Sequence, residues 1–101
     1  MSYRVAFMME SEHDMNDIEE YLAQFHAGAS RKFFDTLKER ISTLRDMPRM
    51  CQAYERDPFF RQMVLGDYLL FYSVDDKRKL VVVHRVLHHS RDVYRHIPHH
   101  Q

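Results

Sequence analysis

The chain has few of the features that mark secreted, membrane or multidomain proteins. Cys51 is its only cysteine, so no intramolecular disulfide can form, which fits a reducing compartment. No apolar stretch approaches the roughly 20 residues that cross a bilayer, and the start, MSYRVAFMMES, lacks the apolar block and cleavage site of a signal peptide. With 101 residues, the sequence predicts one domain in the cytoplasm that makes no membrane contact.

Net charge is also missing, because 15 Lys and Arg balance 15 Asp and Glu. This balance argues against a protein that holds nucleic acid by bulk electrostatics. The charges are unevenly spread, however. Residues 1–26 carry one Arg against six Asp and Glu, a balance of −5, and residues 77–101 carry six Lys and Arg against one Asp, a balance of +5. The two regions are either solvated surfaces of opposite sign or, at the C-terminal end, a basic face for an anionic partner.

The first third of the chain predicts one strand and one helix. The mostly apolar run at residues 3–9 favours a strand. Ser11 is a candidate N-cap, with Asp14 three residues later in a variant of the capping box. Apolar residues at helical spacing then predict a helix that ends near Phe25.

The three prolines and two glycines fall at expected boundaries. Gly28 predicts a tight break after the first helix, and Ser30 a cap for a second helix that Pro48 stops. Two amphipathic helices joined by so short a turn pack as an antiparallel hairpin.

The second half predicts three strands, at residues 60–65, 68–74 and 79–87. Gly66-Asp67 is a two-residue hairpin signal, and residues 75–78 form a longer polar turn. The expected fold is therefore α+β with the order β-α-α-β-β-β, in which a helical hairpin packs on one face of a mainly antiparallel four-stranded sheet. It spans residues 1–101, with a short C-terminal tail from about residue 96.

The stretches LLFY and LVVV do not alternate between apolar and polar residues, as strands with one wet face do. Two helices can cover only one face of a four-stranded sheet. The other face needs cover from the protein's own termini or from another chain, and we expect a dedicated partner to provide much of it.

The ordered combination of these segments resembles the RelE/ParE superfamily of bacterial type II toxin–antitoxin toxins, over about residues 3–95. The resemblance rests on FRQMVLGDYLLFYSVDD and LVVVHRVLHHSRDV in the second half, and on DIEEYL and TLRDMP in the first. It implies a growth-inhibiting toxin of a plasmid-stabilisation type of module. It also implies a cognate antitoxin, acidic and folding on binding, that neutralises the toxin.

The superfamily divides into two mechanisms. RelE-like members cleave mRNA in the ribosomal A site without metal, and ParE-like members bind and poison DNA gyrase. In the first case Arg61, Arg85 and Arg91 are the candidate fixed cations. His88 or His89 would transfer a proton, and Tyr94 lies near where some RelE-like proteins place a C-terminal Tyr.

Three departures make the sequence more similar to the ParE-like side. Leu69 follows Tyr68 where the nuclease branch commonly has an Arg, RMCQAYERDP contains no Lys, and the chain is neutral. A RelE-like endonuclease and an inactive paralogue that only sequesters antitoxin stay open as alternatives. No cofactor is expected in any of these cases.

Structural roles compete for several of these residues. Arg61 and Arg85 could pair with carboxylates such as Asp92 or Glu55 at the sheet edge. His84, in register with Leu80, Val82 and Val86, is expected to be half-buried and hydrogen-bonded. On a strand, His88 and His89 point to opposite faces and cannot serve one site unless the strand has ended. No metal site is expected, although His96, His99 and His100 flank a proline.

Overall fold

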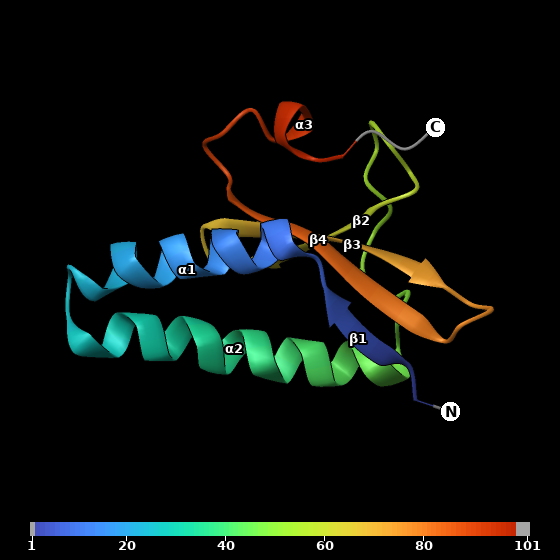
Figure 1. The fold of residues 1–101 in the computed structure, drawn as a ribbon, viewed down its shortest axis with the longest axis horizontal. Helices are drawn as coiled ribbons and strands as arrows, with labels where there is room; N and C mark the ends of the chain where they lie inside the picture. Colours follow the sequence, from blue (N-terminus) through green and yellow to red (C-terminus); the bar gives the residue numbers. More distant parts are fainter. Residues whose placement is uncertain (1, 99–101) are drawn as a thin grey trace.

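The computed structural model describes residues 2–98 and has the expected order of elements (Figure 1). The described elements are β1 (Arg4–Phe7), α1 (Met9–Ala23), α2 (Ala27–Asp46), β2 (Arg61–Leu65), β3 (Tyr68–Asp75), β4 (Leu80–His88) and α3 (Val93–His96). The strand order is β1-β4-β3-β2. β1 lies parallel to β4, and the other two pairs are antiparallel. The α+β prediction is confirmed.

The first core lies between the helical hairpin and one face of the sheet. Ile18 of α1 and Leu37, Ile41 and Leu44 of α2 are buried against alternate residues of the strands. On β3 these are Tyr68, Leu70 and Tyr72, which fits the period of two expected of a strand. Such burial stabilises both helices, since most helical stability in proteins comes from packing of the apolar face.

The helix starts differ from the sequence prediction. α1 begins directly after β1, with Met8 at its N-cap, and the Ser11 hydroxyl inside the helix donates to the Met8 carbonyl oxygen at 2.7 Å. The proposed Ser11 cap and Asp14 capping box are therefore wrong. The reason is that the Met8 N–H donates to the Val83 carbonyl oxygen, which carries the chain from the sheet straight into the helix.

The break between the helices also lies earlier than expected. α2 starts at Ala27, so Gly28 and Ser30 lie within its first turns and neither one ends or caps a helix. The second helix does stop before Pro48, as predicted. Gly66 has a φ of 59° in the β2–β3 turn, a left-handed conformation that glycine adopts at no steric cost, and the predicted hairpin forms there.

The second sheet face is covered by the chain itself, and the expectation that a partner covers much of it is wrong. Phe71 and Leu87 point to this face, where Tyr54 and Phe60 of the α2–β2 loop and Ile97 at the C-terminal end pack on them. Figure 1 shows this loop and α3 on the side of the sheet away from α1 and α2. Both faces of β3 and β4 are therefore largely covered, which explains why these two strands do not alternate, whereas Val64 of β2 stays exposed.

A β-bulge in β4 changes which face of the sheet its later residues point to. Tyr72 pairs with Val83 and Phe71 with Arg85, so His84 is an extra residue on that strand. The expected common register of His84 and Val86 is therefore wrong. Val86 joins the helix-side core, whereas the His84 ring lies 5.0 Å from the ring of Phe60 in the second cluster.

Candidate functional site

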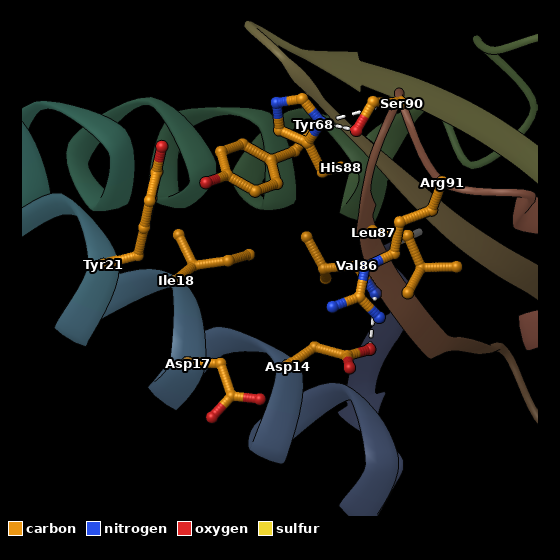
Figure 2. Close-up of a pocket in the computed structure, with 10 residues that line it drawn as sticks. All are labelled: Asp14, Asp17, Ile18, Tyr21, Tyr68, Val86, Leu87, His88, Ser90 and Arg91. Atoms are coloured by element: carbon orange, nitrogen blue, oxygen red, sulfur yellow. Dashed lines mark hydrogen bonds between the residues drawn. The ribbon is translucent and has the colours of Figure 1, made fainter.

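A pocket of about 400 Å³ lies between α1 and the end of β4 (Figure 2). Its floor is apolar, with Ile18 and Val86, and two tyrosine rings and a group of polar side chains stand around it. The lining residues are Asp14, Asp17, Ile18, Tyr21, Tyr68, Val86, Leu87, His88, Ser90 and Arg91. Two of the six candidate catalytic residues, His88 and Arg91, therefore line one pocket.

Asp14 and Arg85 form the most buried ion pair among the described residues, with side chains 12% and 18% exposed. The Asp14 carboxylate accepts from Arg85 Nε at 2.7 Å and Nη2 at 2.9 Å, and from the Val86 backbone N–H at 3.0 Å. β1 ends at Phe7, opposite Val83, so beyond that point β4 has a neighbouring strand only on the side of β3. The carboxylate of α1 takes the place of the missing strand there.

Arg85 also reaches the C-terminal segment, because its Nη1 donates to the His96 carbonyl oxygen. The guanidinium thus joins α1, β4 and the last residue of α3. The side-chain hydrogen bond to Asp14 raises the pKa of Arg85, which fixes its charge. The partner is Asp14 and not Asp92 or Glu55, so an ion pair of Arg85 was correctly expected but its partner was not.

β4 ends at His88, and the side chains of His88 and His89 lie together at this end. Their rings stack with centroids 4.7 Å apart at 24°. The Ser90 N–H donates to His88 Nδ1 at 3.1 Å, and the Ser90 hydroxyl lies 2.6 Å from the same atom. Since a backbone N–H can only donate, Nδ1 is the acceptor and the neutral ring carries its proton on Nε2.

The Arg91 side chain is exposed and points into the pocket in Figure 2. Within residues 2–98 its guanidinium has no ion-pair partner, whereas Arg49, Arg78 and Arg85 each pair with an aspartate. It is therefore a cation that faces the pocket without an ion pair to any described carboxylate.

The remaining candidate residues lie elsewhere. Arg61 Nη1 donates to the Cys51 carbonyl oxygen at 2.7 Å, so neither proposed carboxylate is its partner here. Arg61 pairs with Tyr72, and His88 pairs with Tyr68 on the other side of β3. Tyr68 and Tyr72 are four residues apart, which is about 13 Å along a strand. The backbones of Arg61 and His88 are therefore far apart in the sheet.

Tyr94 belongs to the cover of the second sheet face. The Arg56 guanidinium carbon lies 3.9 Å from the centre of its ring, a cation–π contact, and Tyr54 packs beside it at 6.5 Å. His84 is half-buried and its Nε2 lies 2.8 Å from the Ser73 hydroxyl. Burial lowers the pKa of His84. The structural role expected of this histidine is confirmed.

Sequence reasoning missed Asp14, Tyr21 and Tyr68 as parts of the site. A signal for Asp14 was present, since it stands four residues before Ile18 and thus on the buried stripe of α1. A carboxylate on an apolar stripe needs a partner. No group of three residues suited to hold a metal ion occurs between residues 2 and 98, and His99 and His100 lie outside the described residues. No helix in the described part of the chain is long and apolar enough to span a membrane.

Solved structures similar to this chain are toxins of toxin–antitoxin systems. A RelE toxin of E. coli, a double arginine-to-alanine variant in the free state, has a TM-score of 0.67 at 19% identity over 94% of this chain and 93% of that one. The RelBE2 complex of Mycobacterium tuberculosis gives 0.60 at 24% identity over 87% and 99%. The chromosomal ParDE system of P. aeruginosa gives 0.60 at 11% over 86% and 96%. At these identities the likeness shows the shared fold.

The helical hairpin on a four-stranded mixed sheet is thus the fold of the small toxins of the RelE/ParE superfamily. A family model described as the ParE toxin of the type II toxin–antitoxin system, parDE, matches residues 5–93. The chain belongs to that family. A comparison with curated protein sequences gives no match.

Proposed function

We propose that the chain is a ParE-like toxin that acts in the cytoplasm by binding and poisoning DNA gyrase. The observation that carries this proposal is the state of the cations a nuclease would need. RNA cleavage requires fixed positive groups around one phosphate. Arg85 is held by Asp14, and Arg61 is bonded to a backbone carbonyl at the other end of the sheet. Only Arg91 of the three lacks such a partner within residues 2–98, which supports action by binding.

A RelE-like mRNA endonuclease is the second candidate. It is favoured by the gathering of His88, His89 and Arg91 at the end of β4, where a proton-transfer group and a cation lie close in the chain. Tyr94 would have to leave its contact with Arg56 to join them. An inactive paralogue that only binds antitoxin is the third candidate, and the experiment below distinguishes it.

The proposed partner that neutralises the toxin is a cognate antitoxin, as in the complexes of RelBE2 and ParDE to which this fold is similar. Charge supports an acidic antitoxin segment, because the last quarter of the chain carries the balance of +5. Such a segment would fold on binding and would gain affinity and association rate from this field. The module would serve plasmid stabilisation by arresting growth when the antitoxin is lost.

The test is to induce the chain alone in a bacterial host and to assay the purified protein on gyrase and on reconstituted translation. We expect growth arrest, loss of supercoiling with cleavage-complex DNA breaks, and intact mRNA. Codon-positioned mRNA cuts that disappear with Arg91→Ala but persist with Arg95→Ala would overturn the proposal in favour of the endonuclease. Normal growth at good expression, with both targets untouched, would identify the inactive paralogue.

A further inference from the structure

We infer that the pocket between α1 and the end of β4 binds a nucleoside monophosphate, a ligand class that the gyrase proposal neither requires nor predicts. Its volume of about 400 Å³ falls within the roughly 300–1,000 Å³ of small-molecule sites. The pocket combines an apolar floor, aromatic walls and one unneutralised cation, which are the groups that recognise a base and a phosphate together.

The phosphate end is the turn after β4. Arg91 points into the pocket and has no ion-pair partner within residues 2–98. His88 lines the same pocket, with its Nδ1 taken up by Ser90. The guanidinium fork of Arg91 matches two oxygens of one phosphate group.

The base end lies toward α1. Tyr21 borders the apolar floor made by Ile18 and Val86 and makes a T-shaped contact with Phe25, and being 52% exposed it keeps ring surface on which a base can stack. Figure 2 shows the hydroxyl of Tyr68 directed toward Tyr21. Burial, with Tyr21 and Asp67 adding to it, raises the pKa of Tyr68, so this phenol stays protonated and can donate to a base or a ribose. Stacking on aromatic rings tolerates any base, because every base has a π-face.

The charges around the pocket favour a single nucleotide over a nucleic-acid strand. α1 borders the pocket with Asp14 and Asp17, and the N-terminal region that contains it has the balance of −5. Among the residues that the structure describes, Arg91 is the one arginine that lines this pocket. A strand would bring several phosphates past the acidic helix, and a chain with no net charge gives it little counterion-release energy. One phosphate held by Arg91 brings less negative charge past these carboxylates than a strand does.

The experiment is titration calorimetry of the full chain with guanosine monophosphate, guanosine, ribose 5-phosphate and a short unpaired oligonucleotide, up to millimolar concentration. We expect the nucleotide to bind and the two fragments to bind much more weakly. Arg91→Ala should weaken nucleotide binding by about 10- to 100-fold, the range of hydrogen bonds to a charged group. Tyr21→Ala should weaken it by at least about 5-fold through lost stacking.

Arg95→Ala is the matched control, because it removes an exposed arginine of the same segment that does not line the pocket. Its affinity should equal that of the unchanged chain. Circular dichroism should show that Arg91→Ala and Tyr21→Ala keep the fold. The inference is overturned if the nucleotide does not bind, if ribose 5-phosphate binds as well, if Arg95→Ala loses as much affinity as Arg91→Ala, or if the oligonucleotide binds more tightly than the nucleotide.

Discussion

Replacing Asp14 by alanine is expected to lower the free energy of unfolding by roughly 2–4 kcal/mol. The carboxylate accepts three hydrogen bonds, two from Arg85 and one from the Val86 N–H, and its side chain is only 12% exposed. An unsatisfied buried N–H costs about 1–3 kcal/mol, and removing one partner of a buried ion pair costs about 3–5 kcal/mol. The estimate lies below the sum because Arg85 is 18% exposed and can recover some water.

Urea unfolding followed by circular dichroism measures this change, and thermal unfolding should show a melting temperature lower by roughly 10–20 °C for a domain of this size. Asp14→Asn keeps an oxygen acceptor without the charge and should lower the free energy of unfolding by about half as much. Asp17→Ala is the control on the same helix, exposed and without an ion pair in the described chain, and should change stability by less than about 0.5 kcal/mol. Equal effects of Asp14→Ala and Asp17→Ala would refute the assignment of Asp14 as the carboxylate that completes the edge of β4.

Three further predictions concern other parts of the structure. Ile97→Ala should destabilise the C-terminal segment by roughly 2 kcal/mol, because Ile97 is only 3% exposed, and faster amide exchange in residues 92–98 would report it. Burial lowers the pKa of His84 in the folded chain, so the unfolded chain binds the proton first and stability should fall as the pH drops below about 6.5; His84→Gln should remove that part of the pH dependence in urea titrations. Hydrogen bonds from Arg49 and then Tyr3 lower the pKa of Asp76 to about 2. In an NMR titration the pKa of Asp76 should therefore rise in Arg49→Ala but stay below its ordinary range because of Tyr3, and it should not change in Arg95→Ala.

The sequence was sufficient for the order of elements because each has a local signal. The apolar stripes of α1 and α2, the turn at Gly66 and the boundary at Pro48 all act over a few residues. The helix starts were missed because the hydrogen bond from Met8 to Val83 joins residues 75 positions apart. No local pattern could show that β1 continues into α1 without a loop.

The candidate site was only partly predictable for the same reason. His88 and Arg91 are close in the chain, and the turn that holds them is set by Ser90 two residues after His88. Arg85 was recognised as a cation, but its partner Asp14 lies 71 residues away on another element. The bulge at His84 could not be predicted, because an extra residue in one strand is visible only against its neighbour.

The covered second face changes the physical basis for expecting a partner. Tyr54, Phe60 and Ile97 already exclude water from Phe71 and Leu87, so the apolar surface of β3 and β4 on this face is largely covered, and Val64 of β2 stays exposed beside it. A partner chain that bound there would first have to displace these side chains. Returning each large apolar side chain to water costs roughly 1.5–3 kcal/mol. The antitoxin prediction therefore rests on membership of the toxin family and on the basic C-terminal region. It no longer rests on an uncovered sheet.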